Sequence, residues 1–343
     1  MFQDILARLA NHQTLSEAEA AAAMDEIMEG KAGESQITAF LAMLSLRGES
    51  ADELTGCARS MRAHARQLRV DRPLLDIVGT GGDGTATFNI STASALVISS
   101  LGVDVAKHGN RSVSSTSGAA DVLEALSISI QSTPNDAHHL LDMTHMCFLF
   151  APLYHQSMKY AIGPRKALGF RTIFNMLGPL TNPAGAERQM LGVYSQELAE
   201  LYAHALVRLG TERTLVVTGD DGMDELTIAG RSHILLIENE KITASTLTPE
   251  DVGLHRGTLK AIQVANPAQS AALIESIFTG STAHPEARDA ILLNAGAGLF
   301  TAGFSATIGE GVHEAREALD SGRAIAQLNA LRRASKETIR AHA

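Results

Sequence analysis

Two loops rich in glycine and hydroxyl side chains lie about one helix apart in the sequence, and each follows a short apolar run. The first loop is Gly79–Gly84, with Asn89–Thr92 shortly after it, and the second is Lys107–Ser115. Glycine lets a ligand approach the backbone closely, and backbone amides, hydroxyls and a lysine are the groups that bind phosphate esters. A pair of such loops predicts a ligand that carries phosphate at both ends.

The segments around these loops predict an α/β fold. The runs Leu75–Val78 and Val103–Ala106 are predicted strands, and Ser91–Leu101 between them is a predicted helix. This βαβ unit requires a parallel sheet, and ligands of such sheets bind at the carboxyl ends of the strands. Further strands are predicted at Ile128–Ile130, Cys147–Phe150, Thr214–Val217 and His233–Ile237, with Val193 as a candidate start of one more.

Helices dominate the two ends of the chain. Residues 1–70 are predicted to be helical throughout, and Thr14–Glu17 and Ser50–Glu53 both fit the capping-box pattern at a helix start. A helical stretch at about 154–176 interrupts the strand–helix alternation, and helices dominate again from Pro267 onward. The polar connector Arg69–Pro73 marks the change from the helical part to the α/β part.

Charge and composition limit the class of ligand. The chain has 28 basic and 38 acidic residues and a net charge of −10, which argues against a general nucleic-acid-binding protein. An acidic protein that binds phosphate must use local donors or a metal ion. Cys57 and Cys147 lie too far apart in sequence to suggest a metal pair, and we expect both to be buried thiols.

No apolar run reaches the roughly 20 residues that a membrane-spanning helix needs. The first residues place Phe2, Ile5, Leu6 and Leu9 on one helical stripe, whereas a signal peptide has a basic segment and then a continuous apolar one. We therefore expect a soluble cytoplasmic protein that does not bind a membrane.

The first glycine loop fits three kinds of phosphate site unequally. Gly79, Gly81 and Gly84 match the dinucleotide pattern G-x-G-x-x-G, but the second strand ends in Lys107 instead of the carboxylate that binds a ribose. Thr85 stands where a P-loop requires lysine. Asp83 would repel a bare pyrophosphate, so a pyrophosphate bridged by a metal ion fits best. A tight turn with no ligand is the structural alternative.

Two other segments carry charge that suits this ligand. Gly219–Glu225 follows a predicted strand and holds four carboxylates in six residues, as either a magnesium site or a solvated acidic turn. Tyr154–Thr172 is basic, and its Arg165 is either a clamp for a planar carboxylate or part of a solvated helix face. Asn89 is a predicted helix cap, a role compatible with phosphate binding at the same helix start. No arrangement supports covalent catalysis.

Taken together, five motifs resemble those of the anthranilate phosphoribosyltransferase family. The resemblance covers essentially the whole chain, including the helical start and the C-terminal segment Leu293–Gly296. The five motifs are Gly79–Asp83, Asn89–Thr92, Lys107–Arg111, Asn175–Pro183 and Asp224–Glu225.

The resemblance implies a fold and an activity. It implies a small helical domain over residues 1–70, joined in space by helices from about 154–180, packed on an α/β domain over residues 74–343 with a mostly parallel central sheet, as in nucleoside phosphorylases and phosphoribosyltransferases. It implies a homodimer whose site lies between the domains. The implied reaction moves the 5-phosphoribosyl group from phosphoribosyl pyrophosphate to the amine of anthranilate, with Mg²⁺ as cofactor, in tryptophan biosynthesis.

The same resemblance implies residue roles. The residues implied to bind phosphoribosyl pyrophosphate are Gly79, Gly82, Asp83, Thr87, Asn89, Ile90, Ser91, Thr92, Lys107, His108, Gly109, Asn110, Arg111, Ser112, Val113, Ser114, Ser115 and Ala119. Anthranilate is implied to contact Gly79, Asn110 and Arg165, and Mg²⁺ to contact Ser91, Asp224 and Glu225. No side chain is implied to act as a covalent or acid–base catalyst, so positioning and electrostatics must lower the barrier.

Two positions depart from the family's commonest pattern, and two other functions compete. Ala119 stands where many members have serine, and Thr116 stands where lysine is frequent, so we expect both to affect affinity for phosphoribosyl pyrophosphate. A pyrimidine-nucleoside phosphorylase shares the architecture but has no evident use for Asp224 and Glu225. A relative that binds nucleic acid would need a basic groove, which the net charge disfavours.

Overall fold

A computed structural model describes residues 1–111 and 117–340. Within them a mixed seven-stranded sheet has the order β3-β2-β1-β4-β5-β6-β7. The first five strands in this order are parallel, and β6 and β7 are added antiparallel at one edge. The strands are β1 (Leu75–Gly79), β2 (Val105–Gly109), β3 (Met146–Phe150), β4 (Arg188–Gly192), β5 (Arg213–Gly219), β6 (Ser232–Glu238) and β7 (Lys241–Leu247).

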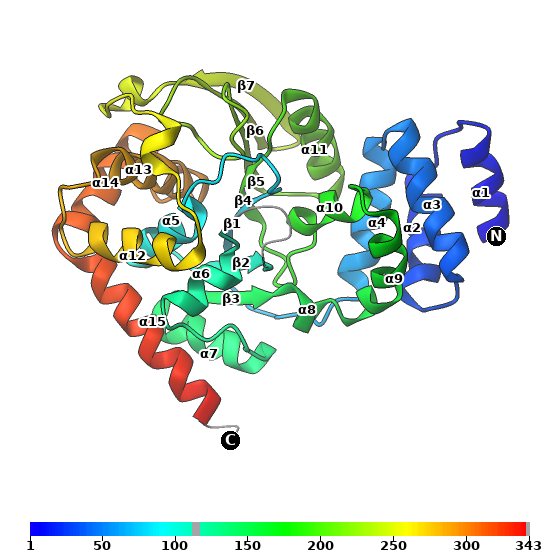
Figure 1. The fold of residues 1–343 in the computed structure, drawn as a ribbon, viewed down its shortest axis with the longest axis horizontal. Coiled ribbons are helices and arrows are strands. Elements are labelled where there is room, and N and C mark those ends of the chain that lie inside the picture. Colours follow the sequence, from blue (N-terminus) through cyan, green and yellow to red (C-terminus); the bar gives the residue numbers. More distant parts are fainter. Residues whose placement is uncertain (112–116, 341–343) are drawn as a thin grey trace.

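Helices α1–α4 form one end of the molecule, as residues 1–70 predict (Figure 1). They are α1 (Phe2–Ala10), α2 (Glu17–Met28), α3 (Glu34–Arg47) and α4 (Ala51–Ala63). The helices α9 (Lys159–Leu168) and α10 (Ile173–Leu177) pack against α3 and α4, so chain segments far apart in sequence lie side by side there.

The remaining helices surround the sheet or connect its strands (Figure 1). They are α5 (Ile90–Ser99), α6 (Ala119–Ala125), α7 (Pro134–Thr144), α8 (Ala151–Tyr154), α11 (Gln196–Leu209), α12 (Pro267–Phe278), α13 (Pro285–Thr301), α14 (Ile308–Asp320) and α15 (Arg323–Arg340). Short 3₁₀ turns cover Gln156–Met158, Gly178–Leu180, Pro249–Val252 and Leu259–Ile262. No helix in the described part of the chain is long and apolar enough to cross a membrane.

Successive side chains of the central strands point to opposite faces of the sheet, and each face packs against its own hydrophobic core. Met190 and Val217 face the core that α5 and α13 cover. Leu191 and Val216 face the other core, which α11 covers and which continues into α1–α4. This period of two is typical of strands buried on both faces. The helical end is thus attached to the sheet through continuous apolar packing.

Three sequence-based expectations need correction. Ile128–Ile130 is not a strand, because the backbone N–H of Ile128 donates to Leu123 of the preceding helix while its side chain is buried. The first capping box is made by Ser16 and Glu19, not by Thr14 and Glu17, and the Ser50–Glu53 box forms as expected. Strand β4 precedes Val193 instead of starting there.

The edge strand β7 was not predicted from the sequence. Its side chains are almost all exposed, so the apolar alternation that identifies half-buried strands is weak there. Strands β1, β2, β3, β5 and β6 form where they were predicted, within a few residues at each end, and helices dominate from Pro267 onward as expected.

Candidate active site

A cavity of ≈ 420 Å³ opens at the carboxyl ends of β1, β2 and β4. Strands β2 and β4 lie on opposite sides of β1, so the cavity sits where the strand order changes direction, the usual ligand site of such sheets. It is lined by Ser45, Glu49, Val78, Gly79, Thr80, Gly81, Asp83, Ala86, Thr87, Phe88, Asn89, Ser91, Lys107, His108, Gly109, Asn110, Arg111, Ser117, Gly118, Ala119, Arg171, Thr172, Asn175, Met176, Tyr194, Leu198, Asp224 and Glu225.

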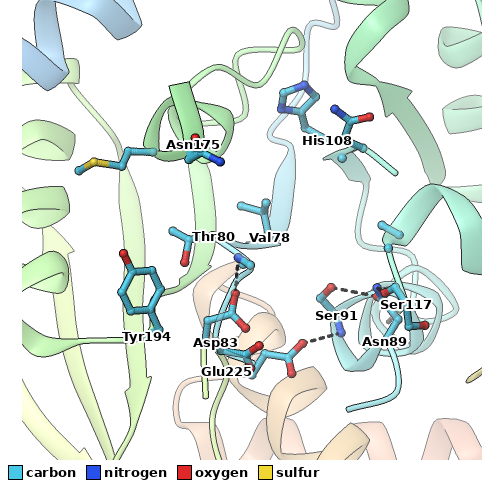
Figure 2. Close-up of a pocket in the computed structure, with 18 of the residues that line it drawn as sticks. Val78, Thr80, Asp83, Asn89, Ser91, His108, Ser117, Asn175, Tyr194 and Glu225 are labelled. Atoms are coloured by element: carbon cyan, nitrogen blue, oxygen red, sulfur yellow. Dashed lines mark hydrogen bonds between the residues drawn. The ribbon is translucent and has the colours of Figure 1, made fainter. Parts of the chain in front are cut away.

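The start of α5 points into this cavity (Figure 2). Asn89 caps the helix, because its side-chain oxygen accepts the backbone N–H of Thr92 at 2.9 Å and the Ser91 hydroxyl at 3.2 Å. Its amide donates to the backbone oxygen of Ser117 at 2.9 Å. The cap therefore orders the loop while the positive end of the helix faces the cavity, which favours an anion there.

The carboxylates of Asp224 and Glu225 enter the cavity from the turn after β5. The backbone N–H of Gly81 donates to Asp224 at 2.6 Å, and that of Ser91 donates to Glu225 at 3.1 Å. The acidic turn thus contacts both the glycine loop and the start of α5, and Figure 2 shows Glu225 beside Ser91 and Asp83. Residues that are distant in sequence meet at one edge of the sheet.

These carboxyl groups resist ionisation. Burial and the nearby Asp83 raise the pKa of Asp224 well above its usual range. Burial and the charge on Asp224 raise the pKa of Glu225 in the same direction. A cation between these groups would remove the repulsion and favour their charged forms. The donor set consists of hard oxygens, which suits Mg²⁺.

Protein side chains alone do not form a closed metal cage here. Among residues 1–111 and 117–340, no group of three or more histidine, cysteine, aspartate or glutamate side chains is arranged to hold a metal ion. Mg²⁺ usually keeps several waters and binds one or two carboxylates together with substrate phosphates. A site that the substrate completes therefore fits Asp224 and Glu225.

Lys107 is a buried cation at the base of the cavity. It is 1% exposed, and its ammonium donates to the backbone oxygen of Ile77 at 2.5 Å and to the Ser91 hydroxyl at 3.1 Å. Burial lowers the pKa of Lys107 to about 8, while the carboxylates of Asp76, Glu225 and Asp224 act in the opposite direction. These hydrogen bonds hold the Lys107 ammonium in place at the base of the cavity. A ligand phosphate there would replace the water that burial has removed from the ammonium.

Two buried histidines lie together beside the cavity. The rings of His108 and His155 have centroids 5.2 Å apart, and His108 Nδ1 lies 3.2 Å from the backbone oxygen of Gly178. Burial lowers the pKa of His108 to about 3 and that of His155 to about 4, so both rings are neutral at pH 7. Within the described residues, Nε2 of each ring has no hydrogen-bond partner.

The two arginines of the basic segment occupy different surroundings. Arg171 lines the cavity, stacks over Tyr194 and donates to the backbone oxygen of Gly82 at 2.8 Å. Arg165 does not line the cavity. Its guanidinium lies over the ring of Phe174, the residue directly before Asn175, which does line it. Its guanidinium makes no ion pair or hydrogen bond within the described part of the chain, and burial lowers the pKa of Arg165.

Most residues proposed from the sequence meet at this cavity, but several do not line it. Those that line it are Gly79, Asp83, Thr87, Asn89, Ser91, Lys107, His108, Gly109, Asn110, Arg111, Ala119, Asp224 and Glu225. Gly82, Ile90, Thr92 and Arg165 are outside the lining, and Ile90 is fully buried in the core. Ser112, Val113, Ser114, Ser115 and the divergent Thr116 lie outside the described residues.

Some lining residues were missed by reasoning from the sequence. Tyr194 and Leu198 follow β4, whose end could not be located from the sequence. Arg171, Asn175 and Met176 lie in quoted segments without an assigned role, since only the packing of α10 against α4 brings them to the sheet. The glycine and acidic motifs were informative because they directly follow strands.

Comparisons with known proteins identify the family. Residues 3–65 match the family model described as "Glycosyl transferase family, helical bundle domain". Residues 71–325 match the family model described as "Glycosyl transferase family, a/b domain". Over 340 residues the chain is 51% identical to an anthranilate phosphoribosyltransferase of Geobacillus thermodenitrificans, covering 99% of both chains. The chain belongs to the anthranilate phosphoribosyltransferase family. Its activity is the phosphoribosyl transfer of that family.

Solved structures agree in fold. The anthranilate phosphoribosyltransferase of Thermus thermophilus has a TM-score of 0.90 at 43% identity, covering 96% of this chain and 99% of that one. That of Saccharomyces cerevisiae, in complex with PRPP (phosphoribosyl pyrophosphate) and Mg, has a TM-score of 0.90 at 28% identity, covering 98% of both chains. The resemblance drawn from the motifs and the expected fold class are confirmed.

Proposed function

We propose that this cavity transfers the 5-phosphoribosyl group from phosphoribosyl pyrophosphate to the amine of anthranilate. The products are N-(5-phosphoribosyl)anthranilate and pyrophosphate. The observation that carries the assignment is the meeting of the glycine loop, the start of α5 and two buried carboxylates at one edge of the sheet. That combination supplies amide donors and cation ligands for a pyrophosphate, as the substrate requires.

We assign the pyrophosphate end to the glycine loop and the start of α5. Gly79, Gly82, Asp83, Thr87 and Asn89–Thr92 bind this end, and Ser91, Asp224 and Glu225 hold Mg²⁺. When bound, Mg²⁺ neutralises charge that develops on the departing pyrophosphate. Asn89 caps α5 and keeps the positive end of this helix directed at the pyrophosphate, and preorganised electrostatics of this kind stabilise a leaving group without rearrangement.

The second loop takes the ribose phosphate in this proposal. Lys107 stands between the two loops, since its ammonium bonds to β1 and to Ser91 of α5. The remaining contacts come from the loop that follows Lys107, through Ser115, and from Ala119. Ala119 has no hydroxyl to offer, so the backbone must contact the ligand there.

Anthranilate is assigned to Gly79, Asn110 and Arg165. The guanidinium of Arg165 is partly buried and has no carboxylate partner in the described residues, which supports a role for it in binding the carboxylate of a ligand. The amine of anthranilate is neutral at pH 7, so its lone pair can attack ribose C1 without a strong base. Holding the nitrogen opposite the leaving pyrophosphate is then the main task of these residues.

We also propose that the protein is a cytoplasmic homodimer, as the family resemblance implies. Large apolar side chains are exposed at the helical end: Leu46 of α3 is 82% exposed, Ile162 of α9 is 60% exposed, and Phe170 after α9 is 50% exposed. Helices α3 and α9 pack together, and Ser45 bonds to the backbone of Arg171, so these side chains share one region. Contact between two copies would bury them.

An activity assay tests the proposed reaction. Incubation with phosphoribosyl pyrophosphate, Mg²⁺ and anthranilate should remove anthranilate fluorescence, and addition of a chelator should stop the reaction. Phosphorolysis of a pyrimidine nucleoside, with no loss of anthranilate, would instead support the nucleoside-phosphorylase alternative.

A pair of variants tests the metal assignment. Asp224→Asn with Glu225→Gln should shift the Mg²⁺ titration of activity to at least tenfold higher concentrations, in the range of effects seen when metal sites lose ligands or their partners (roughly 10- to 100-fold). Asp220→Asn is a matched control, because Asp220 lies in the same turn but pairs with Arg231 and His233 outside the cavity lining. An unchanged titration in the double variant would refute the metal assignment.

A further inference from the structure

Helix α13 carries a buried amide that the proposed reaction does not use directly. Asn294 lies within α13 and is 1% exposed. Its side-chain oxygen accepts the backbone N–H of Leu226 at 3.0 Å, and its amide donates to the backbone oxygens of Leu226 and Ala290, each at 3.0 Å. Both amide hydrogens are therefore occupied, and Asn294 is not free to bind a ligand itself.

These bonds hold the residue that directly follows the two carboxylates. The N–H of Leu226 belongs to the peptide group that joins Glu225 to Leu226, so the bond from Asn294 fixes the orientation of that group. The second bond, to the oxygen of Leu226, fixes the next peptide group. A side-chain amide thus replaces the two-point pairing of a neighbouring strand, and losing a buried partner would leave both backbone groups unsatisfied.

The opposite side of the turn is fixed by close backbone contacts. A Cβ atom at Gly192 would lie 1.5 Å from the backbone oxygen of Asp224. A Cβ atom at Gly79 would lie 2.4 Å from the side-chain carboxylate of Asp224. Asp224 and Glu225 are therefore clamped between the ends of β1 and β4 on one side and Asn294 on the other. A void of ≈ 10 Å³ lined by Asn294, Ser91, Asp224 and Glu225 leaves space for about one water.

The helix that carries Asn294 is itself held at a fixed depth. A Cβ atom at Gly296 would lie 2.6 Å from the backbone nitrogen of Val312 in α14, and one at Gly298 would lie 2.4 Å from Ile98 of α5. Because neither position has room for a side chain, α13 packs closely between α14 and α5. The amide of Asn294 is consequently a rigid anchor for the acidic turn.

We propose that Asn294 is a positioning residue for the reaction: it fixes the direction of the Asp224 and Glu225 carboxylates, which would hold Mg²⁺ for the departing pyrophosphate. This inference rests on the proposed metal role of those two residues. It predicts that removing the amide weakens cation binding even where the protein stays folded, because the carboxylates remain but lose their fixed direction.

The test uses the full-length enzyme and two substitutions. Asn294→Leu has similar volume and no hydrogen-bonding atoms. Asn294→Thr is milder, because its hydroxyl can bond to Ala290 in the way that Thr301 of the same helix bonds to Ala297 at 2.7 Å. Thr301→Val is the matched control, since it removes a buried hydrogen bond from α13 without touching the acidic turn.

Calorimetric titration with Mg²⁺ at saturating phosphoribosyl pyrophosphate gives the main readout, and thermal unfolding without Mg²⁺ shows which variants fold. Both Asn294 variants that fold should bind Mg²⁺ roughly tenfold or more weakly, and Thr301→Val should bind it like the wild type. Wild-type Mg²⁺ affinity in folded Asn294→Thr would overturn the inference, as would an equal loss in Thr301→Val.

The double variant Asp224→Asn with Glu225→Gln is titrated in parallel. If its Mg²⁺ affinity is unchanged, the metal assignment itself is wrong and the role of Asn294 is overturned with it. If its affinity falls while Asn294→Thr keeps the wild-type value, only the positioning role is overturned. A fall in both sets of variants supports both.

Discussion

At the scale of single residues, the cavity gathers ionisable groups that the fold keeps away from water. Burial raises the pKa of the Asp224 and Glu225 carboxyl groups and lowers the pKa of His108 and Lys107. All four groups are therefore shifted toward their neutral forms. Burying an ionised group without a partner is costly, so such an arrangement makes sense where a charged ligand arrives to complete it. A multiply anionic substrate with its cation is such a ligand.

The buried histidines predict a dependence of stability on pH. Because the pKa of His155 is lowered to about 4 from 6.5, the unfolded chain holds a proton in that interval that the folded protein lacks. The stability that comes from burying the neutral His155 ring is therefore fully present above pH 6.5 and is lost as the pH falls toward 4. Each such histidine should cost about 2 kcal/mol between pH 7 and pH 5.

Urea unfolding at the two pH values checks this expectation in metal-free buffer. His155→Gln should lose about 2 kcal/mol less than the wild type over the same interval, and His139→Gln, at an exposed site, should follow the wild type. Identical losses in the wild type and His155→Gln would show that the ring is not buried as a neutral group.

The two arginines should separate the two substrates. Arg165→Ala should raise the KM for anthranilate roughly tenfold or more, since a hydrogen bond to a charged group is worth about 1.5–3 kcal/mol, and should change that for phosphoribosyl pyrophosphate little. Arg171→Ala should mainly raise the KM for phosphoribosyl pyrophosphate, because Arg171 holds the glycine loop through Gly82. Steady-state kinetics with each substrate varied gives both values. Equal effects of Arg165→Ala on both KM values would remove its proposed role.

At the scale of elements, the site depends on where strands end. The residues Gly79, Gly109, Gly192 and Gly219 each close a strand at the same edge of the sheet. The strand–helix alternation around the glycine loops made β1, α5 and β2 predictable, and the acidic turn after β5 could be placed on the same edge. Strand β4 could not be located, because its five residues begin with Arg188 and Gln189 and its periodicity is short.

Gly192 tests whether the end of β4 positions the acidic turn. Gly192→Ala would place a methyl group 1.5 Å from the backbone oxygen of Asp224, so the turn must move. We expect a loss of about 1–3 kcal/mol in stability, together with a shift of the Mg²⁺ titration of activity to higher concentrations. Gly309→Ala is the control: it meets nothing closer than 3.9 Å and should change stability by less than about 1 kcal/mol. Thermal unfolding and Mg²⁺ titration check both, and normal Mg²⁺ dependence in Gly192→Ala would contradict the expectation.

At the scale of the whole molecule, two hydrophobic cores share one sheet. One core lies under α5 and α13, and the other joins α11 to the helical end of the chain. Sequence patterns predicted the helical start and the α/β part, but the packing of α9 and α10 against α3 and α4 involves contacts between segments more than 100 residues apart. Local periodicity contains no information on such contacts, which is why Arg171 and Asn175 were not predicted as lining residues.

The proposed dimer predicts a solution mass. Sedimentation equilibrium should give twice the 36.3 kDa of one chain. Leu46→Glu should shift the population toward monomer, because it places a charge among exposed apolar side chains of α3 and α9. Phe304→Glu changes an exposed apolar residue that follows the end of α13 and should leave the mass unchanged. A monomeric wild type at micromolar concentration would contradict the dimer.

The most direct measurement is the binding of phosphoribosyl pyrophosphate to the protein with Mg²⁺ and with a chelator. The acidic turn and the net charge of −10 predict tight binding with Mg²⁺ and a large loss of affinity when the cation is removed. Equal affinity under both conditions would contradict the central claim that a divalent cation joins the substrate to Asp224 and Glu225.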